Sequence, residues 1–280
     1  MTHSRERIQA AYEAACRMEI EALKPGNVHV FADGHRMSAE QFLVSARVSS
    51  GPLTDPALSV GRRILKSVQA TRRAVDANTN LGIILLCAPL ARAAEMPGEL
   101  RPNLRLLLDA MDVEDAAEVF EAIVLASPGG LGSADAHDVR VPAQAPLLAA
   151  MREAADRDRI ARQYATGFED VFGVGLPALA GAISKGEGGM WPTIFAYMAF
   201  LCGFPDSHVA RKHGTAIAAA IQDEARAVSA ALETAGDEAT RVRLLTDLDR
   251  SLKARGLNPG TSADLTVASL LVHMLGDRLA

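Results

Sequence analysis

The sequence predicts an all-α fold, arranged as a single compact multi-helix domain in which long apolar helices are buried. Of the 280 residues, 49% are hydrophobic and only 4% are aromatic, so the core must consist mainly of Ala, Leu, Ile and Val. Such a composition favours packed helices over a sheet. Apolar residues also recur at helical spacing along most of the chain, and no linker or internal repeat divides residues 1–280.

The first helix is predicted over residues 4–23, where apolar residues recur at helical spacing between charged ones. It is expected to end at residues 24–29, Lys-Pro-Gly-Asn-Val-His, because proline cannot continue a helix and Pro-Gly favours a turn. Ser38 and Gln41 have the spacing of a capping box, which predicts the start of a second helix.

Asp55 and Pro56 predict the start of a third helix, with Asp as N-cap and Pro in the first helical position, running to about Val75. Most of the arginines and lysines in this helix are expected on a solvated face. Residues 81–88 are apolar on every side, which predicts a helix in the middle of the domain. Pro89 is expected to kink or end that helix.

Helical patterns continue through the rest of the chain, over residues 98–110, 112–126, 145–185 with interruptions, 193–201, 215–235 and 240–255. The last helix is expected to follow residues 258–264, in which Thr261 and Asp264 resemble a capping box. Asp264 is then either a charge that offsets the helix dipole or a metal ligand at a helix end.

Charge and composition exclude several classes of partner. A net charge of −5 argues against a general affinity for nucleic acid or for an acidic membrane surface. The longest apolar segment, residues 81–91, is shorter than the roughly 20 residues that a membrane span needs. The N-terminus lacks the apolar run of a signal peptide. Cys16, Cys87 and Cys202 are far apart and lack zinc-site spacing, so we expect a reducing, cytoplasmic setting; a homodimer is compatible with the sequence.

Five polar loops lie at the ends of apolar helices, and such helix ends form a pocket when they converge. The loops are residues 24–29, 78–82, 127–140, 205–214 and 258–264. The turn at 24–29 is a helix stop, but its backbone N–H groups beside Lys24 also suit an anion such as phosphate. The N-terminus of the helix at residue 81 needs either Asn or Thr caps or a bound anion.

The two central loops carry the most chemistry. Residues 127–140 contain three glycines in four positions, which permits close backbone approach to a ligand, and end in His-Asp-Val-Arg. Residues 205–214 combine one carboxylate, two imidazoles and two cations. Together the loops offer carboxylates, amides, glycines and cations, which suits a polyphosphate with a divalent ion, and oxygen ligands favour magnesium.

Four of these motifs, taken in order, resemble the triphosphoribosyl-dephospho-coenzyme A synthases, an all-helical family. The similar segments are Lys-Pro-Gly-Asn-Val-His at 24–29, Asn-Thr-Asn-Leu-Gly at 78–82, Asp206 with Arg-Lys-His-Gly at 211–214, and Pro-Gly-Thr-Ser-Ala-Asp at 259–264. They span almost the whole chain. The resemblance implies that ATP loses adenine and that its triphosphoribosyl group passes to the ribose 2′-hydroxyl of 3′-dephospho-coenzyme A, giving a prosthetic-group precursor.

Glycosyl transfer at a ribose carbon needs a nearby carboxylate, a base for the hydroxyl and Mg²⁺ on the triphosphate. The resemblance therefore assigns roles by position. Metal ligands or stabilisers of the oxocarbenium-like state are Asp138, Asp206 and Asp264, with Glu19 or Glu21 behind them and His137 as a base. Phosphate and substrate binding falls to Lys24, Asn27, His29, Asn78, Asn80, Gly82, Arg211, Lys212, Gly260 and Ser262.

Three departures from the family pattern indicate a divergent branch, similar to uncharacterised members in archaea and one-carbon-metabolising bacteria. The family usually has a basic residue where this chain has Asn80-Leu81, an Arg-Gly-Gly where this chain has 211–214, and an acidic residue where Gly34–Met37 carries a cation. The acceptor can therefore be another phosphorylated coenzyme intermediate. Two rival interpretations stay open: a metal-dependent phosphohydrolase using His29, His35 and Asp264 with His137-Asp138, and a non-catalytic binding protein whose loops are only caps.

Overall fold

The computed structural model describes residues 2–130 and 137–276. Within these ranges the regular elements are helices, and two isolated β-bridges lie in the loop at residues 29–37. The all-α prediction is therefore confirmed. The helices of the described chain are α1 (Arg5–Glu21), α2 (Ala39–Leu53), α3 (Val60–Ala74), α4 (Leu81–Ala94), α5 (Leu100–Ala110), α6 (Val113–Ala126), α7 (Leu147–Ala154), α8 (Arg159–Thr166), the π-helix η1 (Val171–Gly175), α9 (Leu176–Ser184), α10 (Trp191–Gly203), α11 (Ser207–His213), α12 (Thr215–Thr234), α13 (Glu238–Ala254) and α14 (Gly260–Met274).

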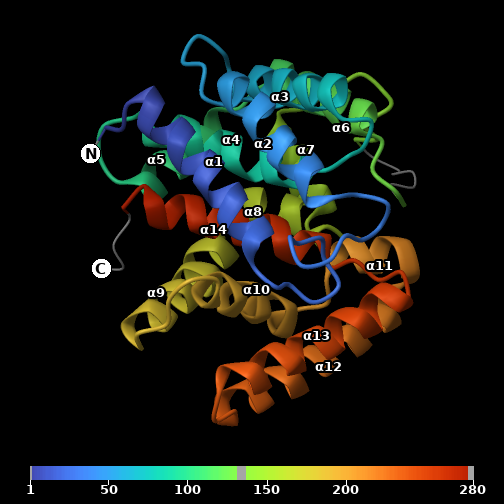
Figure 1. Ribbon diagram of the computed structural model, residues 1–280. Helices are drawn as coiled ribbons and strands as arrows, with labels where there is room; N and C mark the ends of the chain where they lie inside the picture. The colour runs from blue at the N-terminus through green and yellow to red at the C-terminus, as the bar shows by residue number, and fades with distance from the viewer. Residues whose placement is uncertain (1, 131–136, 277–280) are drawn as a thin grey trace.

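Helices α4 and α14 form the centre of the domain. Helix α4 is buried along almost its whole length, as its apolar sequence predicts, and α14 packs against α1, α4 and α10. The larger core cluster joins α1 to α8 with α14, and a second cluster lies between α10, α12 and α13. Figure 1 shows α14 between the upper group of helices and the α12–α13 hairpin below. The start of α14 lies against the start of α4, since a Cβ at Gly82 would overlap the Asp264 carboxylate.

The third helix begins later than predicted. Asp55 and Pro56 belong to a turn, in which the carboxylate of Asp55 accepts the amide of Ala57, and α3 starts after Ser59, whose hydroxyl accepts the amide of Arg62. The expected solvated face is also wrong for Arg63, which is completely buried and makes a bidentate ion pair with Glu95 at 2.7 and 2.9 Å.

Of the two outcomes predicted for Pro89, a kink or a helix end, the end does not occur, since α4 continues through Pro89 to Ala94. The predicted capping box of the last helix needs correction. Helix α14 begins at Gly260 without a side-chain cap of its own, so Thr261 and Asp264 form no capping box. The carboxylate of Asp206, from another loop, accepts the Ser262 amide instead. The capping boxes at Ser38 and Asp112 are both present.

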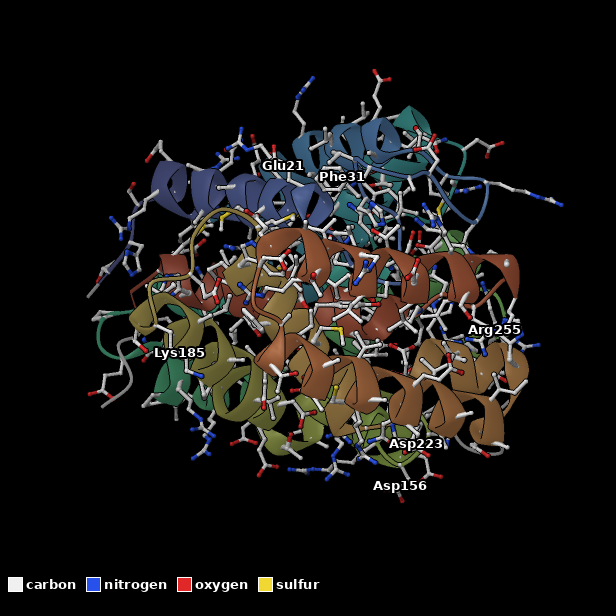
Figure 2. The ribbon with its side chains drawn as sticks, turned by 60° about the horizontal axis from the view of Figure 1, so that its bottom comes forward. Glu21, Phe31, Asp156, Lys185, Asp223 and Arg255 are labelled. Atoms are coloured by element: carbon white, nitrogen blue, oxygen red, sulfur yellow. The ribbon has the colours of Figure 1, made fainter. Side chains whose placement is uncertain are left out.

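The outer surface carries most of the charged side chains. Figure 2 shows Asp223 and Arg255 on the α12–α13 side and Lys185 at the end of α9. Phe31 is 61% exposed beyond the end of α1. None of the helices in the described ranges is long and apolar enough to cross a membrane.

Candidate functional site

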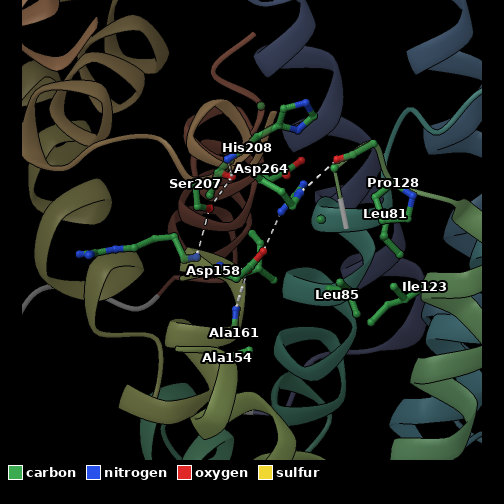
Figure 3. Close-up of a pocket in the computed structure, with 18 of the residues that line it drawn as sticks. Leu81, Leu85, Ile123, Pro128, Ala154, Asp158, Ala161, Ser207, His208 and Asp264 are labelled. Atoms are coloured by element: carbon green, nitrogen blue, oxygen red, sulfur yellow. Dashed lines mark hydrogen bonds and ion pairs between the residues drawn. The ribbon is translucent and has the colours of Figure 1, made fainter. Parts of the chain in front are cut away.

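All five predicted loops contribute to one cavity of about 860 Å³. Asn27, Asn80, Gly129, Lys212 and Asp264 line it, one from each loop. A cavity of this size is large enough for a nucleotide-sized ligand. Figure 3 shows Leu81, Leu85 and Ile123 on one side of it and Asp158, Ser207 and His208 on the other. The convergence contradicts the view that these loops are scattered caps of a scaffold protein.

The N-termini of five helices in the described chain, α4, α8, α11, α12 and α14, lie at the wall of this cavity. Each helix start presents backbone N–H groups and a partial positive charge. Asp158 caps α8 by accepting the amides of Ile160 and Ala161, and Asp206 caps α11 by accepting those of His208 and Val209. At the start of α4 the only amide that a described side chain accepts is that of Leu81, which Asn78 binds, so the amides of Gly82 and Ile83 are left able to bind an anion.

Asp264 lies at the start of α14 and faces the start of α4. A methyl group on Gly82 would overlap the Asp264 carboxylate, so the glycine is what allows the two helices to approach so closely. Among the described residues, no hydrogen bond reaches this carboxylate. Burial, together with the negative charge of Glu19, raises the pKa of Asp264 well above its usual value. A carboxylate in this position favours an approaching cation or a developing positive charge.

Glu19 is the second buried carboxylate of the cavity, and it pairs with Lys24. The ammonium of Lys24 lies 2.8 Å from Glu19 Oε1 and also donates to the Val28 carbonyl at 2.6 Å. Lys24 is completely buried and is not among the described residues that line the cavity. Burial raises the pKa of Glu19, and the nearby lysine opposes that shift. The lysine therefore neutralises Glu19 rather than reaching the cavity itself.

Arg211 and Lys212 are the cations of α11 that line the cavity. The guanidinium of Arg211 donates to the Gly129 carbonyl at 3.2 Å and to Asp158 at 2.9 Å, as the dashed lines of Figure 3 show. Lys212 has no acceptor among the described residues, and burial together with the charge of Arg211 lowers its pKa. A Cβ at Gly130 would lie 2.8 Å from the Arg211 carbonyl oxygen, so this glycine allows the loop to lie against α11.

The turn at 24–29 is held from outside the cavity by α13. Asp249 accepts the Gly26 amide at 2.9 Å and lies 3.4 Å from His29 Nε2, and this histidine is buried away from the cavity. Asn27 faces the cavity, where its amide group donates to Asn258 at 2.8 Å. The turn therefore contributes Asn27 to the site, and the neighbouring side chains hold it in place.

Most of the predicted site residues line the cavity. They are Glu19, Asn27, Asn78, Asn80, Gly82, His137, Asp138, Arg211, Lys212, Gly260 and Asp264. Five predicted residues do not: Glu21, Lys24, His29, Asp206 and Ser262. Residues 131–136 of the glycine-rich loop lie outside the described residues.

Asp206 and Ser262 bind each other instead of facing the cavity. Asp206 Oδ2 accepts both the amide and the hydroxyl of Ser262, at 2.8 and 2.9 Å, and Asp206 Oδ1 accepts two amides of α11. Asp206 is only 1% exposed. Its carboxylate thus joins the N-termini of α11 and α14, and this occupies the oxygens that a metal would need.

A family model described as ATP:dephospho-CoA triphosphoribosyl transferase (CitG) matches residues 5–280, almost the whole chain. The chain belongs to this family.

Two individual proteins are similar to this transferase-family chain. A protein designated "Probable 2-(5''-triphosphoribosyl)-3'-dephosphocoenzyme-A synthase" from Pseudomonas paraeruginosa is 29% identical over 215 residues, covering 76% of this chain and 62% of that protein. The chain thus spans less than two thirds of the length of that relative. A crystal structure from Archaeoglobus fulgidus, provisionally assigned as a triphosphoribosyl-dephospho-CoA synthase, has a TM-score of 0.66 and 27% identity, covering 84% of this chain and all of that one.

The predicted metal ligands of this family member do not gather into one cluster. Within the described ranges, no three His, Cys, Asp or Glu side chains are placed to hold a metal ion, since Asp206 caps two helices and Asp138 pairs with Arg140. Mg²⁺, however, is usually bound by one or two carboxylates together with substrate phosphates. Asp264 meets that requirement because its carboxylate lacks a hydrogen-bond donor among the described residues and Glu19 lies near it.

Several residues of the site were not singled out by the sequence. Asp158, His208 and Asn258 also line the cavity, as does His35, which only the phosphohydrolase interpretation uses. Burial and the charge of Lys212 lower the pKa of His208 to about 3, so its imidazole is neutral near pH 7. Asp158 shows only an N-cap pattern before α8, and a cap signal does not reveal that the helix end faces a cavity.

Proposed function

We propose that the protein transfers the triphosphoribosyl group of ATP to the ribose 2′-hydroxyl of 3′-dephospho-coenzyme A and releases adenine. Membership of the transferase family supports this activity, and so do the designations of both relatives. The observation that carries the proposal is that the partly buried carboxylate of Asp264, the buried carboxylate of Glu19 and the start of α4, with its two amides that lack an acceptor in the described chain, meet in one cavity.

The carboxylates suit the reacting carbon. In the reaction, the acceptor oxygen forms a bond to the ribose C1′ of ATP as the bond from C1′ to adenine breaks, and positive charge develops on the ribose. A preorganised negative charge stabilises that state most where water is excluded. Asp264 is the group best placed for this role, with Glu19 behind it, because a bound cation and the developing positive charge would favour its ionised form despite its raised pKa. His137, at the cavity wall, is proposed to take the proton of the acceptor hydroxyl.

The helix ends and cations suit the phosphates. The free amides at the start of α4 would bind a phosphate, with Asn78 and Asn80 beside them to orient it. Lys212 would offset the remaining charge of the triphosphate, and Arg211 would face a phosphate of the acceptor. Mg²⁺ is proposed as the cofactor, held by Asp264 and by phosphate oxygens, where it would neutralise triphosphate charge. Lys24, His29, Asp206 and Ser262 are left out of this assignment because their side chains face away from the cavity.

The test is incubation of the protein with ATP, Mg²⁺ and dephospho-coenzyme A, with chromatography for free adenine and mass spectrometry of the acceptor. Adenine in equal amount to a triphosphoribosylated acceptor is the expected result. Release of inorganic phosphate without adenine would instead indicate a phosphohydrolase. Adenine release that needs a different phosphorylated acceptor would keep the transfer chemistry and replace the acceptor.

The cellular setting remains a prediction of the sequence. The three cysteines have no disulfide partner among the described residues, and Cys16 and Cys87 are buried, which suits the expected reducing cytoplasm. Cell fractionation tests the location, and analytical ultracentrifugation tests the homodimer.

A further inference from the structure

The cavity has a second, apolar end that the reaction chemistry does not explain. Helices α4, α6, α7 and α8 supply Leu85, Ile123, Met151, Ala154 and Ile160 to this part of the wall. Leu85, Met151 and Ile160 are 6 to 7% exposed, so they belong to the core and have the cavity as their open side. We call the region lined by these five residues the apolar lobe.

An ion pair lies between the apolar lobe and the proposed reaction centre. Arg211 extends from the Gly129 carbonyl to the carboxylate of Asp158, which caps α8. Figure 3 shows His208 and Asp264 on one side of this ion pair and Leu85, Ile123 and Ala154 on the other. A ligand that fills both ends of the cavity must therefore pass a guanidinium at the boundary between them.

The chemistry of the apolar lobe decides which substrate group suits it. The side chains of these five residues offer a triphosphate no hydrogen bonds to replace its hydration, so binding it against them is costly. Adenine departs from the carbon that reacts beside the carboxylates, so it belongs at the polar end. The group that remains is the part of the acceptor furthest from its reacting hydroxyl. In dephospho-coenzyme A that part is the uncharged pantetheine arm, which is joined to the nucleotide through a diphosphate.

We propose that the apolar lobe binds an extended uncharged arm of the acceptor, and that the guanidinium of Arg211 contacts the diphosphate from which this arm begins. The proposal rests on the proposed function for the identity of the acceptor. The acceptor is then a nucleotide that carries an organic arm on its diphosphate, rather than a nucleotide without such an arm. Binding in the lobe contributes to affinity for the acceptor and leaves the affinity for ATP unchanged.

The test substitutes residues of the apolar lobe and measures binding by calorimetry. Ala154→Phe fills the lobe, and Ile123→Gln places an amide in it; both positions are only partly buried, so the fold tolerates change there. Ala149→Phe is the matched control, since Ala149 is on the same helix, is also partly buried and is not among the residues lining the cavity. The probes are dephospho-coenzyme A, ADP as the acceptor without its arm, and ATP.

The expected result is at least a tenfold rise in the Kd of dephospho-coenzyme A for Ala154→Phe, since apolar groups of this size account for about 10- to 200-fold in discrimination. ADP and ATP should bind each variant as they bind the wild type, and the control should bind all three probes normally. Circular dichroism shows whether each variant is folded. If Ala154→Phe does not fold, the binding of dephospho-coenzyme A by Ile123→Gln tests the proposal instead.

Three outcomes would overturn the proposal. The first is an unchanged affinity of the variants for dephospho-coenzyme A, and the second is a loss of ATP affinity in its place, which would put adenine in the apolar lobe. The third is a wild-type protein that binds dephospho-coenzyme A no more tightly than ADP. Because these measurements record binding, they are separate from the activity. A wild type that shows the expected binding but releases no adenine would refute the proposed function and leave the lobe assignment intact.

Discussion

The starts of α4 and α8 face the same cavity but differ in how their backbone amides are satisfied. At the start of α8, Ser207 accepts the amide of Arg159, and Asp158 accepts the amides of Ile160 and Ala161, at 2.9 to 3.1 Å. At the start of α4, Asn78 accepts the amide of Leu81 at 3.3 Å. The next two amides of α4, those of Gly82 and Ile83, have no acceptor in the described part of the chain.

We infer that the difference separates a structural helix end from a functional one. A buried amide without an acceptor costs about 1 to 3 kcal/mol, so a protein keeps one only where something else binds it. Helix α8 is capped by the carboxylate of Asp158, which also forms an ion pair with Arg211. Helix α4 is open toward the carboxylate of Asp264, and a bound phosphate with a bridging cation would satisfy both. We therefore expect changes at α4 to affect catalysis and changes at α8 to affect mainly stability.

Gly82→Ala should have the largest effect. The added methyl group would overlap the Asp264 carboxylate and force α4 and α14 apart at the reaction centre. We expect the rate of adenine release to fall by a factor of 10³ or more, as several kcal/mol of transition-state stabilisation are lost. The measurement is kcat with ATP and dephospho-coenzyme A, with circular dichroism to confirm the fold.

Gly181→Ala is the control for this glycine. Gly181 lies within α9, and nothing stands within 4 Å of an added Cβ. Alanine should there raise the free energy of unfolding by about 0.5 to 1 kcal/mol and leave kcat unchanged. Equal activity in Gly82→Ala and Gly181→Ala would show that close approach of the two helices is not needed for catalysis.

Asp264→Asn should lower kcat by about 10² to 10³, the usual loss for one preorganised electrostatic group. It should also stabilise the protein without ligands. The pKa of Asp264 is raised in the folded state, so its stabilising contribution is present below the unfolded value and is lost as the pH rises through the folded value. The advantage of Asp264→Asn over the wild type in free energy of unfolding should therefore grow from pH 5 to pH 8.

Urea unfolding at several pH values measures this advantage, and Asp206→Asn is the matched control. Asp206 is a buried aspartate that accepts four hydrogen bonds, so the amide should cost stability at neutral pH. An Asp264→Asn variant that loses stability as Asp206→Asn does would place Asp264 among the structural caps.

Asp158→Ala should affect stability more than catalysis. It removes the cap of α8 and the partner of Arg211, and loss of an N-cap costs about 0.5 to 2 kcal/mol. We expect the free energy of unfolding to fall by this amount while kcat at saturating substrates stays within about fivefold. Asp158→Asn, which keeps an oxygen acceptor, should recover most of the stability. If kcat fell as far as in Asp264→Asn, the distinction between the two helix ends would not hold.

The sequence predicted the fold and the convergence of the five loops because both depend on local signals. Apolar periodicity and polar helix ends are visible along the chain, and a helix with an apolar surface all round must be central. Roles within the site depend on which side chains meet across the fold. Lys24 and Lys212 were both assigned to phosphate, yet Lys24 pairs with Glu19 and only Lys212 lines the cavity.

The same reason explains the difference between Asp206 and Asp264. Both are aspartates near a helix start, and the sequence gives no means to separate them. The structure shows that Asp206 is surrounded by donors from α11 and α14, whereas Asp264 faces Gly82 and the cavity. His208 escaped notice because its neutral state depends on burial and on the charge of Lys212, which are properties of the folded chain.

Substitutions of Asn78 should have the smallest effect. They distinguish two roles of this side chain at the start of α4, as a cap of the helix and as a contact of the phosphate. Asn78→Ala removes the acceptor of the Leu81 amide and the side-chain amide at the cavity wall. We expect a loss of about 1 kcal/mol in the free energy of unfolding and a rise of about threefold to tenfold in the KM for ATP. Asn78→Asp keeps the acceptor and adds a negative charge, so it should unfold like the wild type but raise the KM further. If both variants lost stability and kept the wild-type KM, Asn78 would serve α4 only as a cap, and the phosphate would have to bind through Gly82 and Ile83 alone.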